Sequence, residues 1–297
     1  MTEPRLDRGA DGAAPIRLGP PIRLGHALIW VIAAAIAAQI AGGSVADFLR
    51  VLLETRGLKA AQLEHAPMVV IPALLASGGA LLAVTLFAPL VSGVPMRAAF
   101  GLRAAPPAAF LLAGLGTVAL GPTGDWLMRL AAELYPSATL GVVPMLNELV
   151  QKTPLYVVWP AFALMPGLSE ELAFRGLLQN AAGPARLRLV LSAALFALFH
   201  VDPHHVVGVL PLGIFLAWVG ARYGTLVTIG AHALNNTIAI AAVRVGQGSD
   251  EVAPWPWLLA SWLIVLGCIV ALSSTNKPAE RPIVIGEQAT SDAGVEP

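Results

Sequence analysis

Residues 155–176 read LYVVWPAFALMPGLSEELAFRG, an apolar run of membrane length that ends with two adjacent acids and an arginine. The three charged residues are Glu170, Glu171 and Arg175. An ionisable side chain in the hydrocarbon costs about 2.5 kcal/mol or more on insertion scales, so it persists mainly where it lines a cavity and takes part in chemistry. The segment therefore predicts a buried polar site inside a bundle of membrane helices.

The composition of the whole chain agrees with a membrane protein. Hydrophobic residues make up 57% of the 297 residues, charged residues only 12%, and the mean hydropathy is +0.74. An ordinary soluble domain carries about 25% charged residues. The formal net charge is zero, so no basic face indicates a nucleic-acid partner, and the single cysteine, Cys268, permits no intramolecular disulfide.

Apolar stretches of about 20 residues, the length that crosses a bilayer, recur along the chain. They begin near His26, Pro67, Ala105, Pro154, Arg188, His205, Thr225 and Pro256. We therefore predict an all-α polytopic membrane protein, with about eight transmembrane helices bundled around an intramembrane catalytic cavity. The transmembrane domain is expected over residues 26–273, with a catalytic core at 150–245 and disordered cytoplasmic tails at 1–25 and 274–297.

The distribution of Lys and Arg predicts how the chain is oriented. Of the 18 Lys and Arg residues, twelve fall on the side of the two termini and six on the other side. The positive-inside rule then places both termini in the cytoplasm. The polar start of the chain lacks a convincing cleavable signal, so the first helix is expected to stay as an anchor. The predicted location is the inner (cytoplasmic) membrane of a cell.

The two acids of the first cluster have different expected surroundings. On a helix with about 3.6 residues per turn, Glu171 and Arg175 share a face, whereas Glu170 is rotated by about 100°. An i,i+4 ion pair lets Arg175 neutralise Glu171, which leaves Glu170 free to face a cavity as a general base. Taken alone, the same cluster at a cytoplasmic helix end would simply be solvated.

Two more pairs with the same four-residue spacing lie on later apolar segments. Phe196 and His200 end the apolar run at 190–200, and His232 and Asn236 lie within the span that begins at Thr225. Each pair projects from one helix face. Asn235 is adjacent to Asn236 and is an open alternative for its role.

The boundaries of these spans place Glu170 near the cytoplasmic end of its helix and His200 near the outer end of the next helix. The two side chains can meet only if that fifth helix begins later and enters more steeply, or if a boundary is displaced by several residues.

Together these residues form a coherent hydrolytic set. Glu170, assisted by His200, can deprotonate a water, while His232 and Asn236 donate hydrogen bonds to the oxyanion on a peptide carbonyl. This interpretation requires no cofactor. In the alternative, a zinc ion is held by Glu170, His200 and His232 with one position open for water, although the sequence contains no HExxH motif.

In this order the motifs resemble a known family of intramembrane peptidases. EExxxR at 170–175, FxxxH at 196–200 and HxxxN at 232–236 fall within about 70 residues. They are similar to the motifs of the CPBP or Abi family, the CAAX protease and bacteriocin-processing enzymes, which includes the type II CAAX prenyl endopeptidases. The resemblance covers roughly residues 150–245, and the N-terminal half carries no family-specific signal.

The resemblance implies roles for individual residues. Glu170 and His200 would activate the water, His232 and Asn236 would form the oxyanion hole, and a glutamate-dependent mechanism is favoured over a metal-dependent one. Glu171 and Arg175 complete the first motif and are counted with the catalytic set.

The leading functional prediction is an intramembrane endopeptidase that cleaves a membrane-associated or lipidated peptide or protein by a glutamate-activated water. Its expected partners are that substrate and the lipid bilayer, with no nucleic acid. The alternative is a non-catalytic membrane protein of immunity or scaffolding. A proton-coupled carrier is a third class, because intramembrane Glu and His also build proton relays, but the chain shows no internal repeat of the kind common in carriers.

Overall fold

The computed structural model describes residues 22–63, 65–136, 142–246 and 254–275. Regular structure within these ranges is helical, and this confirms the predicted all-α fold class. The two predicted tails lie almost entirely outside the described residues, so their disorder stays a prediction.

Six segments of the described chain are long and apolar enough to cross a membrane. This supports a multi-pass membrane protein. The segments are α1 (Leu24–Glu54), α3 (Pro67–Ser92), α5 with α6 (Pro107–Ala119 and Gly121–Leu134), α11 (Pro203–Tyr223), α12 (Thr225–Arg244) and α13 (Trp255–Ser274).

The other two predicted spans are helical but differ from a simple membrane helix. The fourth is a continuous helix over 155–178, in which α and π turns alternate. Its parts are α8 (Leu155–Trp159), η1 (Pro160–Leu164), α9 (Met165–Glu171) and η2 (Leu172–Leu178). The fifth, α10 (Ala185–Phe199), has 15 residues. At about 1.5 Å per residue it is shorter than the hydrocarbon layer, which is about 30 Å thick.

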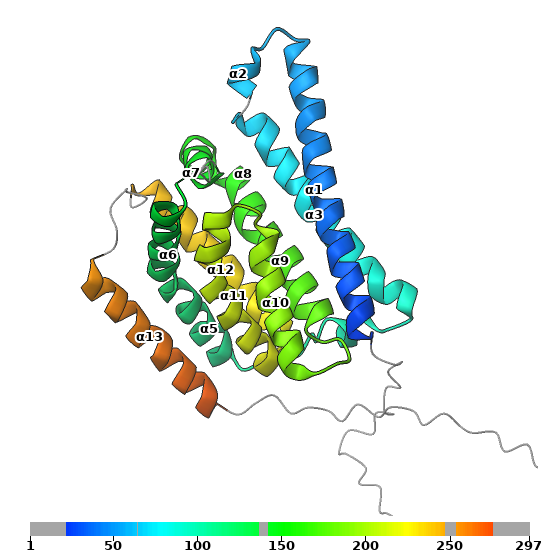
Figure 1. Cartoon of the computed structure of the whole chain (residues 1–297), viewed down its shortest axis with the longest axis vertical. Helices are drawn as coiled ribbons and strands as arrows, with labels where there is room; N and C mark the ends of the chain where they lie inside the picture. Colours follow the sequence, from blue (N-terminus) through cyan, green and yellow to red (C-terminus); the bar gives the residue numbers. More distant parts are fainter. Residues whose placement is uncertain (1–21, 64, 137–141, 247–253, 276–297) are drawn as a thin grey trace, which may run out of the picture.

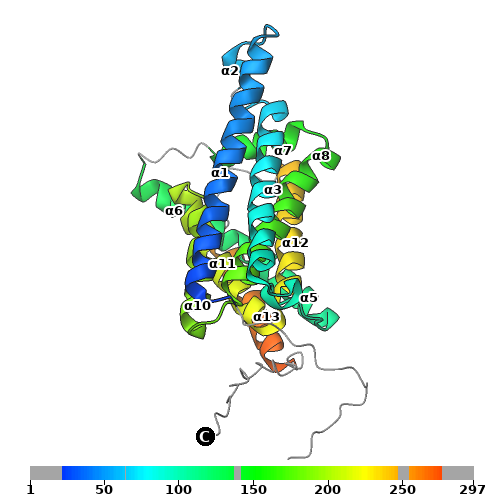
Figure 2. The ribbon, with the colours of Figure 1, turned by 90° about the vertical axis from the view of Figure 1, so that its right-hand side faces the viewer.

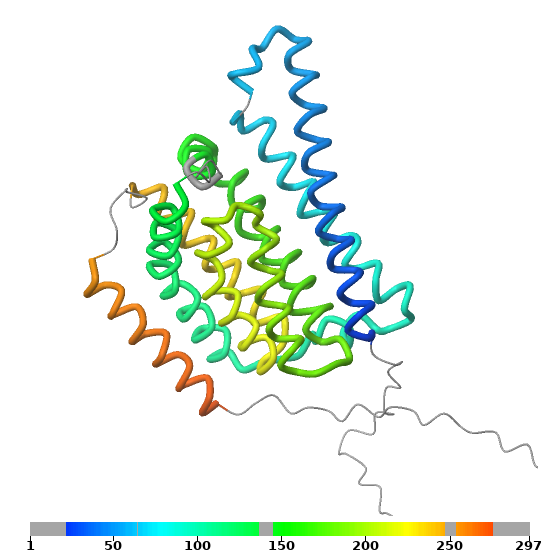
Figure 3. Tube along the Cα trace, in the orientation of Figure 1, coloured from blue at the N-terminus to red at the C-terminus, as the bar shows by residue number. Residues whose placement is uncertain are grey.

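The helices form a central group with an arm on each side. Figure 1 shows α9, α10, α11 and α12 in the middle, with α1 and α3 leaning on one side and α13 at the opposite edge. The most extensive helix–helix interface is that between α1 and α3, which lie side by side in Figure 2. Helix α10 packs along α11. The trace in Figure 3 shows the α1 and α3 hairpin extending beyond the central group. The short helices α2 (Ala60–Leu63), α4 (Met96–Ala99) and α7 (Val142–Lys152) connect these elements.

Two apolar clusters fill the space between these helices. One joins α1 and α3 to η2, with Phe100, Phe174 and Phe196 as its large side chains. The other joins α5, α11, α12 and α13 around Phe215 and Tyr223. The polar residues of the three motifs lie on α9, η2, α10 and α12, the helices that meet between these clusters.

A close approach between α9 and α12 brings two of the motifs together. A Cβ atom on Gly167 would lie 3.1 Å from the backbone nitrogen of Ala233. A larger residue at 167 would push the helices apart, because backbone atoms cannot move aside as a flexible side chain can. Glycine at this position therefore sets the distance between the paired glutamates and His232.

Candidate active site

The helix that carries the glutamates is irregular for a reason visible in its sequence. Pro166 has no N–H, so it cannot donate to the carbonyl of Phe162, four residues earlier, as an α-helix requires. Asn236 on α12 donates to that carbonyl instead, with Nδ2 at 3.1 Å from the oxygen. Side chains of neighbouring helices commonly replace hydrogen bonds lost at proline in membranes. The two π segments border α9, and such π turns are frequent at functional sites.

Glu171 is bound to two partners through one oxygen, Oε1, while its Oε2 has no hydrogen-bond partner among the described residues. Its Oε1 lies 2.9 Å from Nη1 of Arg175, and both side chains have 0% exposure, so the predicted i,i+4 ion pair is confirmed. The same oxygen lies 3.0 Å from Nδ1 of His232. One carboxylate thus joins the first and third motifs across the α9 and α12 contact.

The guanidinium of Arg175 is held from three sides. Besides Glu171, its Nη2 donates to the carbonyl of Gly213 on α11 at 3.0 Å. Its Cζ lies 4.1 Å from the centre of the Phe196 ring, a cation–π contact. The stem of the side chain passes Gly220, where an added Cβ would lie 3.2 Å from Cγ of the arginine. Arg175 therefore connects η2, α10 and α11 around one buried charge.

The hydrogen bond to Glu171 also assigns the protons of His232. A carboxylate oxygen accepts, so Nδ1 of His232 carries the hydrogen. A neutral imidazole then has an accepting Nε2, whereas an imidazolium would donate from Nε2 as well. With Nδ1–H bound to Glu171, His232 can serve as an oxyanion donor from Nε2 only in the protonated form.

Glu170 differs from its neighbour in its bonding. The side chain is buried, with 8% exposure, and its Oε2 has no hydrogen-bond partner among the described residues. Oε2 of Glu171 is unpaired as well. The difference is that Glu171 is bound through Oε1, whereas no hydrogen bond or ion pair of the Glu170 carboxylate is found among the described residues. The expected division between a neutralised and a free glutamate agrees with this geometry, while the catalytic cavity in front of Glu170 stays a prediction.

His200 is held by its own helix. It caps the C-terminus of α10, and its Nδ1 lies 3.0 Å from the carbonyl oxygen of Phe196. A carbonyl only accepts, so Nδ1 carries the hydrogen and Nε2 has the free lone pair that a base requires. No described hydrogen bond joins His200 to Glu170, so the predicted partnership of these two groups would have to run through a shared water.

The expected difference in depth between the glutamates and His200 is wrong. Arg175 lies level with Phe196, and Oγ of Ser192 donates to the carbonyl of Phe174 at 3.0 Å. Glu171 lies one helical turn before Arg175. His200 lies one turn after Phe196, on a helix that runs in the opposite direction, so Glu171 and His200 are at the same level. The error came from treating the fifth segment as a full membrane crossing, because α10 has only 15 residues and ends at Phe199.

The two adjacent asparagines on α12, Asn235 and Asn236, are joined by a hydrogen bond. Asn236 donates one N–H to Phe162, and its Oδ1 accepts from Nδ2 of Asn235 at 3.3 Å. A carboxamide has two N–H donors, so the second N–H of Asn236 is not used by these contacts. Asn236 thus points toward the helix of the glutamates and Asn235 supports it.

His205, which follows His200 in the sequence after a turn that contains a proline, also lies in this neighbourhood. Its ring centre lies 4.6 Å from that of His200. The pair Asp202 and Pro203, a capping residue followed by proline, is a helix-start signal that could have placed His205 in a first turn.

The zinc alternative has no preassembled ligand set. Among the described residues, no three His, Cys, Asp or Glu side chains are gathered as metal ligands would be. Glu170, His200 and His232 remain a predicted set for that alternative, and metal dependence stays open to experiment.

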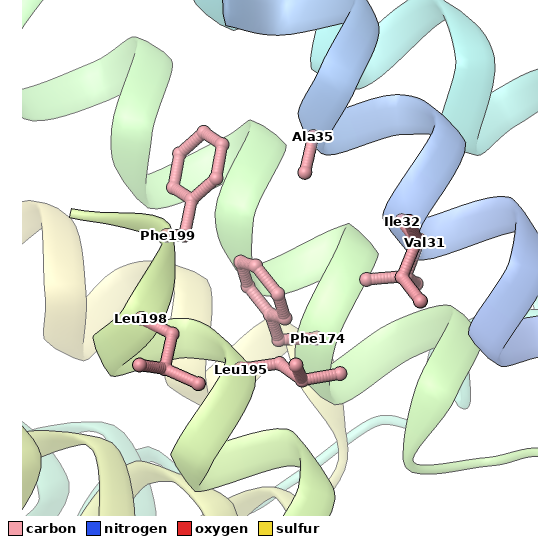
Figure 4. Close-up of a pocket in the computed structure, with 7 residues that line it drawn as sticks. All are labelled: Val31, Ile32, Ala35, Phe174, Leu195, Leu198 and Phe199. Atoms are coloured by element: carbon pink, nitrogen blue, oxygen red, sulfur yellow. The ribbon is translucent and has the colours of Figure 1, made fainter. Parts of the chain in front are cut away.

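An apolar groove lies beside the site on the side of α1. It has a volume of about 160 Å³, and Figure 4 shows its lining side chains. The lining residues are Val31, Ile32, Ala35, Phe174, Leu195, Leu198 and Phe199. The Phe174 ring packs edge-on against Phe196 at 5.9 Å, so one aromatic contact separates the groove from the buried network.

The chain matches a family model over residues 152–238, that of the type II CAAX prenyl endopeptidase Rce1-like proteins. Comparisons with curated proteins and with solved structures gave no match. The matched segment contains the whole 155–178 helix and all three polar motifs. It confirms the family that the motifs predicted. Over this segment the chain is similar to the CAAX proteases of the CPBP family, and the match supports a CAAX-type intramembrane endopeptidase at the level of that family.

Proposed function

We propose that this protein hydrolyses a peptide bond in a membrane-associated or lipidated peptide, with Glu170 as the general base. The observation that carries the proposal is the contrast between the adjacent acids. Glu171 is bound to Arg175 and His232 through Oε1, whereas the carboxylate of the buried Glu170 makes no hydrogen bond or ion pair among the described residues. A carboxylate kept free in a membrane interior costs free energy, and proton transfer from a water is a function that would retain it.

In the proposed reaction Glu170 takes a proton from water as the water oxygen attacks the peptide carbonyl carbon. His200 orients the same water through the lone pair on Nε2, since Nδ1 is bound to Phe196. A shared water would let Glu170 and His200 act in one mechanism although no described hydrogen bond joins them.

The oxyanion that forms on the carbonyl needs hydrogen-bond donors already in place. We assign this role to Nε2–H of protonated His232 and to the second N–H of Asn236. The C–N bond then breaks, and Glu170 returns its proton to the leaving amine. The reaction consumes one water and yields a carboxylic acid and an amine, which ionise to a carboxylate and an ammonium, with no covalent enzyme intermediate.

The apolar groove supports a substrate that reaches the site from the bilayer. Its walls are aliphatic and aromatic, and Phe174 and Phe199 link it to Phe196 and His200. An apolar chain attached to the peptide would find a compatible surface there. The inner membrane as location, and both termini in the cytoplasm, complete the proposal.

The test compares purified wild type with Glu170→Gln in proteoliposomes. The probes are an isoprenylated CAAX-type peptide and a library of unmodified membrane peptides, each with and without a zinc chelator. Thermal unfolding of both proteins serves as the control for folding.

Loss of cleavage in Glu170→Gln alone is the expected result. Loss of wild-type activity on chelation would move the assignment to the zinc alternative. No cleavage of any probe by a folded wild type would favour the immunity or scaffold function.

A further inference from the structure

The turn between α10 and α11 is strained. Val201 has a φ of +63°, and it is the only non-glycine residue with a positive φ in the described chain. A β-branched residue rarely adopts this conformation. The N–H of Asp202 donates to the carbonyl of His200 at 2.6 Å, which closes a three-residue turn around Val201. Such strain persists only where the surrounding structure fixes it, and it clusters at functional sites.

Two side-chain contacts hold the residues after this turn. Oδ1 of Asp202 accepts from the backbone N–H groups of His204 at 2.9 Å and His205 at 3.3 Å, which caps the first turn of α11. The buried His204 reaches the carbonyl of Tyr135 beyond α6 with Nε2 at 3.2 Å. The start of α11 is therefore fixed to α6 as well as to α10.

The result is that His205 lies against His200. Their ring centres are 4.6 Å apart and the rings meet edge to face at 67°. The other aromatic neighbours of His200, Phe196 and Phe199, are more distant, at 5.2 and 6.4 Å. His200 is thus enclosed by three rings while its Nδ1 is bound to the Phe196 carbonyl. Rotation of the imidazole would require His205 to move.

We infer that His205 is a positioning residue for His200, whose ring keeps the Nε2 lone pair of His200 aimed at the reacting water. The inference rests on the proposed role of His200. It concerns packing, because no described hydrogen bond joins the two imidazoles. A phenyl ring at 205 should then replace the imidazole, whereas a methyl group should not.

The first experiment measures kcat, KM and thermal unfolding of His205→Ala and His205→Phe on the CAAX-type peptide. His205→Ala is expected to lower kcat by about 10- to 100-fold, as a misplaced catalytic group does, with KM and the unfolding temperature unchanged. His205→Phe is expected to retain a kcat close to wild type. Wild-type kcat in His205→Ala would overturn the inference, and so would an equal loss in both folded variants, because the imidazole nitrogens rather than the packing would then be required.

A second readout does not depend on activity or on the substrate. In protein with ¹⁵N-labelled histidine, the His200 ring, assigned through His200→Gln, is expected to show a single tautomer with hydrogen on Nδ1. His205→Ala should give averaged nitrogen shifts, and His205→Phe should not. Unchanged shifts in His205→Ala would contradict the inference. If Glu170→Gln cleaved like wild type, the proposed function would fail, while these spectra would still decide the role of His205.

Discussion

The two acids at the end of α9 are adjacent in sequence and both buried, yet their surroundings differ in kind. Around Glu171 a network of Arg175, His232 and the Gly213 carbonyl binds three helices together. Around Glu170 no hydrogen bond or ion pair of the carboxylate is found among the described residues. Burial alone therefore does not distinguish the two acids. In the proposed mechanism, the bonds to Oε1 make Glu171 the acid that holds the helices, and Glu170, which has no such bonds among the described residues, is the acid available for chemistry.

Among the predicted substitutions, Arg175→Ala is expected to have the largest effect, because it disrupts the network around Glu171. Removing the guanidinium leaves Glu171 buried with only His232, and loss of one partner of a buried ion pair typically costs about 3–5 kcal/mol. The expected result is a large drop in the free energy of unfolding, measured by thermal or denaturant unfolding in detergent. A wild-type free energy of unfolding would show that the network does not hold the bundle together.

A smaller effect is expected from Asn236→Leu. The substitution leaves the carbonyl of Phe162 without the donor that Pro166 cannot supply. Hydrogen bonds between membrane helices are worth about 0.6 kcal/mol on average and up to about 1.7 kcal/mol. We expect a loss of free energy of unfolding in this range, together with a loss of cleavage. Asn235→Leu is the matched control, because Asn235 contacts Asn236 but makes no described hydrogen bond to the glutamate helix. An equal loss of cleavage in both variants would assign the role to the pair.

The smallest effect is expected from Arg50→Ala on α1. Arg50 pairs with Asp47 at 3.2 Å, but the two side chains are 40% and 75% exposed. Ion pairs of this kind contribute about 0–1 kcal/mol. The same change from arginine to alanine should therefore be almost neutral here, which makes it the reference for Arg175→Ala. Equal unfolding temperatures for the two variants would remove the distinction between buried and exposed charge.

Much of the architecture could be predicted from the sequence. The eight apolar segments correspond to helices whose starts lie within a few residues of the expected positions, because hydrophobic length is a local property. The pairing of Glu171 with Arg175 could also be predicted, since four-residue spacing on a helix is local as well.

The contacts between helices could not be predicted in this way. That His232 binds Glu171, and that Asn236 donates to Phe162, depends on the approach of α12 to Gly167. The short length of α10 and the strained turn at Val201 bring His200 level with the glutamates. These distances cannot be inferred from the hydrophobic periodicity of any single segment, because they arise from packing between segments far apart in the chain.

The most direct test compares Glu170→Gln with Glu171→Gln, measuring both the free energy of unfolding and the rate of peptide cleavage. Glu170→Gln is expected to keep its stability and to lose cleavage by about 10²- to 10⁴-fold, the usual contribution of a general base. Glu171→Gln is expected to lose stability, because the charge of Arg175 would then be buried without a counterion. A folded Glu170→Gln variant that cleaves at the wild-type rate would contradict the account.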